Sequence, residues 1–149
     1  MANPTSQPEL TLMVVPAFSP VCNLGFALRR EVFVLEQGVP EDIEHDADDL
    51  TATHIVGLAE GAVIAVARVA FKPDYAKIGR VAVARSHRGR AIGARLIAFA
   101  VEVAREQGQK QCYLESQIDK IDFYSRLGFV AFGEEFLDAG IVHRKMKNY

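Results

Sequence analysis

A short segment rich in arginine and glycine lies between an apolar strand pattern and a helical pattern, and its residues could bind an anion. It reads ARSHRGRAIGAR, and its basic side chains are Arg85, His87, Arg88, Arg90 and Arg95. The first amides of the following helix have no intrahelical acceptor, and the helix dipole adds roughly half a positive charge there. The small residues Gly89, Ala91 and Gly93 would let a phosphate approach the backbone. We therefore interpret the segment as a pyrophosphate cradle.

Other interpretations of this segment stay open at this point. Glycine also breaks loops for purely structural reasons, and arginine often does no more than solvate them. The spacing matches neither G-x-x-x-x-G-K-[ST] nor G-x-G-x-x-G, so the usual signatures of nucleotide triphosphate and dinucleotide binding are missing. A nucleic-acid patch is a third reading, but 17 basic and 19 acidic residues nearly cancel. Because no basic face is evident elsewhere, we expect no nucleic-acid partner.

The elements that position this segment follow from hydrophobic periodicity, which alternates between two and about 3.6 residues. The pattern predicts a strand at 10–14, a helix from Ser19 to Gly38, a hairpin over 54–71 that turns at Glu60-Gly61, and a strand at 78–83. After the segment it predicts a helix that ends at Gly108, a strand at 112–114, a short helix at 118–127, and strands at 129–132 and 141–146. This β-α-β-β-β-α-β-α-β-β order predicts an α/β fold with a mixed sheet between helices.

Two details of the first half are specific expectations. In the first helix, the apolar face is predicted to comprise Val21, Leu24, Leu28, Val32 and Leu35. Arg29, Arg30 and Glu31 are predicted on the other face. The run 41–53 is dense in acidic residues and is predicted to be an exposed loop.

Length and composition bound the remaining possibilities. A chain of 149 residues, half of them apolar, is expected to form a single domain over 1–149, with residues 1–8 as a flexible tail. Cys22 and Cys112 form neither a disulfide framework nor a zinc site, and His45 lacks a second histidine at a ligand interval, so no metal is expected. No signal peptide or membrane span is evident. These features favour a cytoplasmic protein without a membrane partner.

Two motifs together resemble the GNAT acetyltransferase superfamily. The stretch VAVARSHRGRAIGARL is followed about thirty residues later by FYSRLGF, and the order of elements agrees. REVFVLEQGVP, THIVGLA and GIVHRKM further resemble the ElaA/YjcF-like branch of that superfamily. The resemblance extends from Leu10 to Met146. It implies a mostly antiparallel sheet of about seven strands and transfer of an acetyl group from acetyl-CoA to an amine of a small molecule or peptide.

The resemblance implies roles for the cradle and the strand before it. The family pattern [QR]-x-x-G-x-[GA] falls on Arg88, Ala91 and Gly93, and the interleaved residues that would also bind CoA are Gly89, Arg90, Ile92 and Ala94. Val81, Ala82 and Val83 would bind the pantetheine arm through their backbone. Ala91 stands where the family usually has glycine. Relative to glycine, alanine would cost about 1 kcal/mol of stability if the site needs a positive φ, and nothing if φ is helical.

The second motif implies an acid for the leaving group. Tyr124 stands where the family tyrosine protonates the departing CoA thiolate, and its alternative role is simple packing beneath the sheet. Arg126 would meet the ribose phosphate of CoA, or would be a solvated helix residue.

The acceptor amine needs a base, and three residues are candidates for it: Glu36, Glu115 and His143. Glu36 and Gln37 end the first helix, at the end of the sheet where the family binds its acceptor, while Glu115 and His143 lie on later strands. We therefore expect all four to contact the acceptor. A non-catalytic acyl-CoA-binding module is the alternative to an enzyme, and the resemblance also makes a homodimer an expectation.

Overall fold

The computed structural model describes residues 9–149, so the predicted tail at 1–8 lies outside the described residues. Its helices are α1 Pro20–Arg29, α2 Glu41–Glu44, α3 Ile92–Glu106 and α4 Ile121–Ser125, with a π-helix η1 Arg30–Glu36 and 3₁₀ turns η2 Ala47–Leu50, η3 Arg85–His87 and η4 Ile118–Lys120. Its strands are β1 Thr11–Val15, β2 Thr53–Ala59, β3 Ala62–Phe71, β4 Ala76–Val83, β5 Cys112–Gln117, β6 Val130–Asp138 and β7 Ile141–Lys147. This succession confirms the predicted order of elements.

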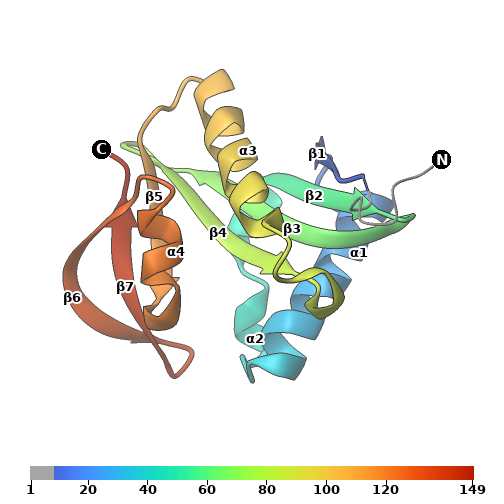
Figure 1. Ribbon diagram of the computed structural model, residues 1–149, viewed down its shortest axis with the longest axis horizontal. Helices are drawn as coiled ribbons and strands as arrows, with labels where there is room; N and C mark the ends of the chain where they lie inside the picture. Colours follow the sequence, from blue (N-terminus) through green and yellow to red (C-terminus); the bar gives the residue numbers. More distant parts are fainter. Residues whose placement is uncertain (1–8) are drawn as a thin grey trace.

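All seven strands form one sheet in the order β1-β2-β3-β4-β5-β7-β6 (Figure 1). Every neighbouring pair is antiparallel except β4 and β5, which are parallel. The predicted mixed, mostly antiparallel sheet is therefore confirmed. The last two strands differ in extent from the prediction, because β6 continues to Asp138 and leaves only Ala139 and Gly140 as the turn to β7.

Alternation along β3 separates the two faces of the sheet. Ala65, Ala67 and Val69 pack in the large core that also contains α3 residues, whereas Val66 packs with Leu28 of α1. The helices α3 and α1 therefore lie on opposite faces of the sheet (Figure 1). Because side chains alternate along a strand, Arg68 lies on the same face as Val66, the face that α1 covers.

The predicted faces of the first helix are partly wrong. Leu28 and Val32 are buried as expected, but Leu24 and Leu35 are 57% and 63% exposed, while Arg29 is only 1% exposed. Two features change the buried face. Gly25 packs so closely that an added Cβ would lie 3.2 Å from Val66 Cγ2, and the helix continues as a π-helix, whose wider turns rotate the face away from a 3.6-residue repeat.

The prediction that the acidic run 41–53 is an exposed loop holds for most of its residues, among them Glu41, Asp42 and Asp46, but it is wrong for two carboxylates. The run folds into α2 and η2 and carries Glu44 and Asp49, each 2% exposed, into the interior. Arg29 Nη1 lies 2.7 Å from Asp49 Oδ1, and Arg29 Nε also bonds Glu44. Arg68 Nη1 bonds Asp49 Oδ1 at 2.8 Å, so one carboxylate joins two guanidinium groups. Density of charge signals exposure only where the charges lack partners.

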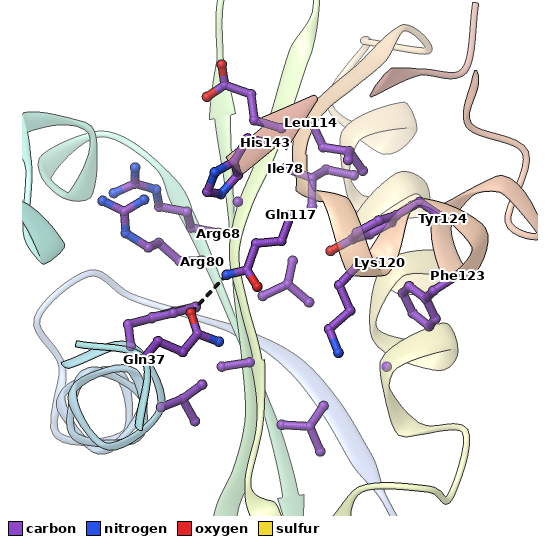
Figure 2. Close-up of a pocket in the computed structure, with 18 of the residues that line it drawn as sticks. Gln37, Arg68, Ile78, Arg80, Leu114, Gln117, Lys120, Phe123, Tyr124 and His143 are labelled. Atoms are coloured by element: carbon purple, nitrogen blue, oxygen red, sulfur yellow. Dashed lines mark hydrogen bonds between the residues drawn. The ribbon is translucent and has the colours of Figure 1, made fainter. Parts of the chain in front are cut away.

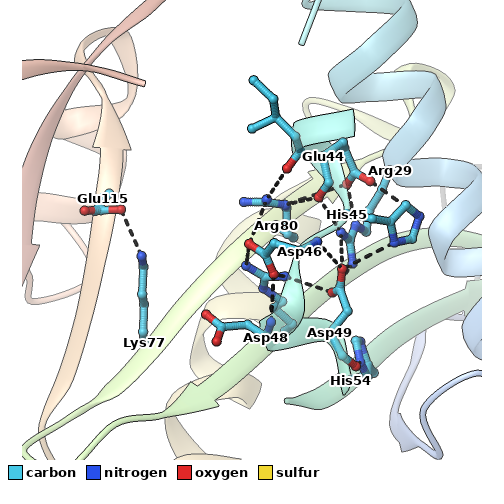
Figure 3. Close-up of polar contacts among 12 residues, drawn as sticks. Arg29, Glu44, His45, Asp46, Asp48, Asp49, His54, Lys77, Arg80 and Glu115 are labelled. Atoms are coloured by element: carbon cyan, nitrogen blue, oxygen red, sulfur yellow. Dashed lines mark hydrogen bonds and ion pairs between the residues drawn. The ribbon is translucent and has the colours of Figure 1, made fainter. Parts of the chain in front are cut away.

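These residues belong to a buried ion cluster, defined here as the buried Arg29, Glu44, Asp49 and Arg68 together with the more exposed Asp46 and Arg80 at its rim (Figure 3). Burial alone would raise the pKa of Asp49, but hydrogen bonds from Arg29 and Arg68 and their charges outweigh burial and hold that pKa well below its usual range. Asp49 is therefore a carboxylate at any pH near neutrality. The cluster ties α1, the acidic run and β3 together on the face of the sheet that α1 covers.

Removing Arg29 from the cluster is expected to destabilise the protein strongly. Arg29→Met would leave Glu44 and Asp49 buried with fewer partners, which typically costs about 3–5 kcal/mol of unfolding free energy. Arg30→Met is the matched control because Arg30 pairs with Glu41 at the surface, where such pairs contribute up to about 1 kcal/mol. Urea unfolding of both variants measures the difference. Equal stabilities would mean that the cluster contributes nothing beyond an exposed pair.

Candidate active site

A cleft of about 760 Å³ begins at the cradle, passes between β4 and β5 and ends beside the buried ion cluster (Figure 2). It exists because β4 and β5 pair only through Ala76 with Cys112 and Lys77 with Tyr113, and then diverge. The predicted residues that line it are Gln37, Val81, Ala82, Val83, Arg88, Gly89, Ala91, Ile92, Gly93, Ala94, Glu115, Tyr124 and His143. The structure thus brings the cradle and most of the acceptor candidates into one cavity.

Divergence of the strands leaves part of the β4 backbone available. Ala84 N donates to Ile64 O at 2.8 Å, which directs alternate backbone groups, those of Ala82 and Ala84, toward β3. The backbone groups of Val81 and Val83 therefore point the other way, into the cleft. The C=O of Val83 accepts a hydrogen bond from Arg88 Nε at 3.0 Å. An extended ligand with amide groups could pair with this edge as an added strand would.

The start of α3 presents unpaired amides to the same cleft. Ala91 is the N-cap residue and supplies no side-chain hydrogen bond, and within residues 9–149 the N–H groups of Ile92, Gly93 and Ala94 have no acceptor. Gly89 has φ +79°, and a Cβ built there would meet no atom within 4 Å. This arrangement of backbone donors, open space and Arg88 fits a pyrophosphate. Arg90, although next to Ala91, does not line the cleft.

Gly93 is also needed for the packing of two helices, which the sequence did not indicate. A Cβ added to it would lie 3.2 Å from Phe123 Cζ, closer than most side chains allow. The missing side chain therefore lets α3 and α4 approach each other, in addition to any access it gives to a phosphate. Through this contact Gly93 helps to hold α4, and with it Tyr124.

Ala91 adopts a positive φ, the backbone conformation in which alanine is less stable than glycine. Its φ of 59° and ψ of 18° are left-handed, where an L-residue is strained by about 1–2 kcal/mol. Ala91→Gly should therefore raise the unfolding free energy by about 1 kcal/mol or somewhat less. Ala98→Gly, on an exposed position inside α3, should lower it by about 1 kcal/mol and serves as the control. Thermal denaturation distinguishes the two, and a loss of stability in both variants would contradict the expected relief of strain.

Tyr124 lies on α4 with its side chain directed into the cleft (Figure 2). Its ring packs edge-on against Phe123 and Phe129, at centroid distances of 4.9 and 6.3 Å. No hydrogen-bond partner of its hydroxyl is found in the described part of the chain. Burial raises the pKa of Tyr124 to about 12, so the phenol keeps its proton at any physiological pH.

The three base candidates differ in their surroundings. Glu36 does not line the cleft, and its carboxylate pairs with Arg88 Nη2 at 2.9 Å. Glu115 lines it, but Lys77 Nζ lies 3.0 Å from one oxygen and Tyr113 donates to the other at 3.0 Å. Burial favours the neutral form of Glu115, yet the hydrogen bond and charge of Lys77 outweigh it and lower its pKa. Glu115 is therefore a weak base, while Glu36 is held by Arg88 outside the cleft.

His143 has the geometry of a base. Its Nδ1 lies 2.7 Å from the C=O of Ile141. A carbonyl can only accept, so Nδ1 carries a proton and Nε2 of the neutral ring keeps its lone pair. The ring stacks on Phe136 at a centroid distance of 5.8 Å, is 9% exposed and lines the cleft. The hydrogen bond and the stacking together hold the imidazole in one orientation.

The cleft also contains residues that the sequence analysis did not select: Arg68, Lys77, Arg80, Gln117, Lys120 and Phe123. Arg68 had a detectable signal, because it is the one charge in the apolar run AVIAVARVAF. Gln117 donates a hydrogen bond to Gln37 Oε1 at 2.8 Å across the cleft. The two residues are 80 positions apart, so no local sequence pattern predicts this contact. Arg126 is exposed and does not line the cleft.

Comparison with known proteins agrees with this fold and site. The acetyltransferase (GNAT) domain family matches residues 14–149. ElaA of Escherichia coli is 36% identical over 78% of this chain and 79% of its own, and the uncharacterized N-acetyltransferase YjcF of Bacillus subtilis is 34% identical over 82% and 88%. The fold and cleft are those of an acyl-CoA N-acyltransferase, and the chain belongs to the GNAT acetyltransferase family.

Solved structures show the same architecture. The crystal structure of Escherichia coli ElaA superposes with a TM-score of 0.84 at 30% identity, covering 95% of this chain and 99% of ElaA. An acyl-CoA N-acyltransferase from Pseudomonas aeruginosa gives 0.84 at 28% identity, covering 96% and 100%. A GNAT family acetyltransferase from Elizabethkingia anophelis with acetyl-CoA bound shares the fold, with a TM-score of 0.65 at 14% identity over 93% and 94%. Within residues 9–149, no helix is long and apolar enough to cross a membrane.

Proposed function

We propose that this protein transfers the acetyl group of acetyl-CoA directly to a primary amine of a small molecule or peptide. The observation that carries the proposal is the continuity of one cleft. The unpaired α3 amides and the free edge of β4 lie at one end, and Tyr124 and His143 lie farther along the same cavity. Such a cleft can hold the thioester donor and the amine together, which direct transfer requires.

His143 and Tyr124 have separate roles in the reaction, one at the acceptor amine and one at the leaving sulfur. Nε2 of His143 takes a proton from the acceptor ammonium, so that the neutral amine can attack the thioester carbonyl. As the new C–N bond forms and the C–S bond breaks, Tyr124 donates its hydroxyl hydrogen bond to the leaving sulfur. A phenol with a pKa of about 12 is a weaker acid than a thiol, so Tyr124 keeps its proton and stabilises the leaving thiolate through this hydrogen bond. The second proton that the attacking nitrogen loses as the amide forms converts the thiolate to the thiol.

A route through an acetyl-cysteine is disfavoured. Cys22 and Cys112 are both free and buried, and burial raises the pKa of each thiol. Neither is a ready thiolate, the form that would attack a thioester. Reduced, unpaired cysteines also fit the cytoplasmic location that we propose.

Isothermal titration with acetyl-CoA and with CoA is the first test. Wild-type protein should bind both, and Arg88→Ala should weaken binding by about tenfold, because a guanidinium contact to a phosphate is lost. Arg105→Ala, at the far exposed end of α3, is the control and should bind as wild type. Folded wild-type protein that binds neither compound would refute the proposal.

Turnover separates an enzyme from a binding module. Thiol release from acetyl-CoA in the presence of a panel of primary amines should exceed release without amine, and the acetylated amine should appear by mass spectrometry. Tight binding without acetylation of any amine would favour the non-catalytic acyl-CoA-binding module.

A further inference from the structure

Arg80 occupies a strained position on β4. The pairing of β3 with β4 shifts register between Val66 and Arg68, so the single residue Ala67 faces the two residues Arg80 and Val81. This is a β-bulge, and Arg80 has the left-handed φ of 51°. Glycine is the residue suited to that conformation, and Gly79 is adjacent but does not occupy it. Backbone strain of this kind persists where the surrounding structure fixes it, and such positions cluster at ligand-binding sites. A β-bulge also changes the direction of the side chain that it carries.

The short ion pairs of the buried ion cluster do not involve Arg80. Asp46 forms two bonds to Arg68, at 2.7 and 2.8 Å, and Asp49 is shared by Arg29 and Arg68. Arg80 Nε donates to the C=O of Glu44 at 3.0 Å, and its Nη2 lies 3.3 Å from both Ile43 O and Asp46 Oδ2. The carboxylate oxygen Oε1 of Glu44 lies 3.7 Å from Arg80 Nε, which is too far for a hydrogen bond.

One edge of the Arg80 guanidinium is therefore available. None of residues 9–149 hydrogen-bonds its Nη1, the side chain is 25% exposed, and the residue lines the cleft. Burial, followed by repulsion from Arg68 and Arg29, lowers the pKa of Arg80. An anion placed there would relieve this repulsion.

Other polar groups surround the same part of the cleft. Arg68 and Arg80 lie among the lining residues together with His143, Gln37 and Gln117 (Figure 2). His143 is the proposed base, so the reacting amine must lie near its Nε2. The cluster already balances three guanidinium groups with three carboxylates. A single negative charge that enters together with the positive charge of an amine keeps this balance, whereas a dianionic phosphate would not.

We infer that the acceptor is an amine that also carries a carboxylate, the chemistry of an amino acid, and that Arg80 binds the carboxylate while His143 faces the amine. This inference rests on the proposed acetyltransferase function. The acidic run does not offer a competing site for a polycationic amine, because the carboxylates of that run that line the cleft are already bonded to arginines.

Binding to the CoA-saturated protein tests the inference without requiring turnover. Isothermal titration would compare matched pairs that differ by one carboxylate: glycine with methylamine, L-phenylalanine with 2-phenylethylamine, and L-lysine with 1,5-diaminopentane. At least one carboxylated member should bind about tenfold or more tightly than its partner, as a charge-assisted hydrogen bond provides. Equal binding within every pair, or preference for the amines without a carboxylate, would overturn the inference.

Variants assign the preference to Arg80. Arg80→Gln should remove it, Arg80→Lys should keep part of it, and Arg80→Gly should remove it while relieving the backbone strain. Arg30→Gln, whose arginine pairs with α2 outside the cleft, should keep the whole preference. A preference that survives both Arg80→Gln and Arg80→Gly would overturn the assignment. A general loss of structure is recognised because it would weaken CoA binding as well.

Acetylation of the same pairs separates this inference from the proposed function. If amines of both kinds are acetylated at equal kcat/KM, the acetyltransferase proposal stands and the carboxylate subsite is refuted. If the carboxylated compounds bind through Arg80 but no amine is acetylated, the subsite stands and the acetyltransferase proposal fails.

Discussion

Replacement of Tyr124 by phenylalanine should lower kcat by about 10²–10³-fold, the usual contribution of a hydrogen-bond donor positioned at a developing anion. The cause is loss of the hydroxyl that faces the leaving sulfur. The ring contacts with Phe123 and Phe129 stay in place, so the fold and the affinity for acetyl-CoA should change little. Steady-state kinetics with an acetylated amine, together with titration of acetyl-CoA, measures both quantities.

Tyr75→Phe is the matched control for this experiment. Tyr75 lies outside the cleft, so removal of its hydroxyl should leave kcat at the wild-type value. Because Tyr124 stays protonated with a pKa of about 12, its loss should lower the rate by the same factor at pH 7 and pH 9. A Tyr124→Phe enzyme with wild-type kcat would show that the tyrosine serves packing alone.

His143→Gln should produce the second large effect, a decrease in kcat/KM of about 10²–10⁴-fold. Glutamine can still donate to the C=O of Ile141, but it offers no basic nitrogen to the acceptor. Steady-state kinetics with an acetylated amine measures kcat/KM of both proteins, and a wild-type value in the variant would show that His143 is not the base.

Glu115→Gln distinguishes the histidine from the carboxylate. Both oxygens of Glu115 are already paired, with Lys77 and Tyr113, and its pKa is lowered, so this change should reduce kcat/KM far less than His143→Gln does. The opposite ranking of the two variants would make Glu115 the base and His143 a packing residue. Glu36→Gln should have a small effect of a different kind, on acetyl-CoA affinity through Arg88.

Local patterns in the sequence predicted the elements well because each one depends on residues close together in the chain. Ser19 accepts a hydrogen bond from Cys22 N at the start of α1, and Glu60 and Gly61 have the positive φ values of a tight hairpin turn. Gly108 and Gly128 have positive φ just after α3 and α4. Caps and turns of this kind are short-range, so composition and spacing were sufficient to locate them.

Prediction failed where burial depends on partners that are distant in the chain. The acidic run was expected to be exposed, yet Asp49 meets Arg29 from 20 positions earlier and Arg68 from 19 positions later. Arg29 was expected on the outer face of the first helix because a charged side chain usually faces solvent. A charge can be buried when opposite charges accompany it, and only the pairing of β3 with its neighbours brings those charges together.

The sequence by itself determined the order of elements, the family resemblance and the position of the cradle before α3, because motifs and periodicity are written along the chain. The tertiary structure alone decided which side chains enter the cleft. The divergence of β4 from β5 opened it, the bulge at Arg80 aimed a guanidinium toward it, and the bond from His143 to Ile141 selected its tautomer. Each of these depends on strand register and on contacts across the sheet, which spacing along one strand does not contain.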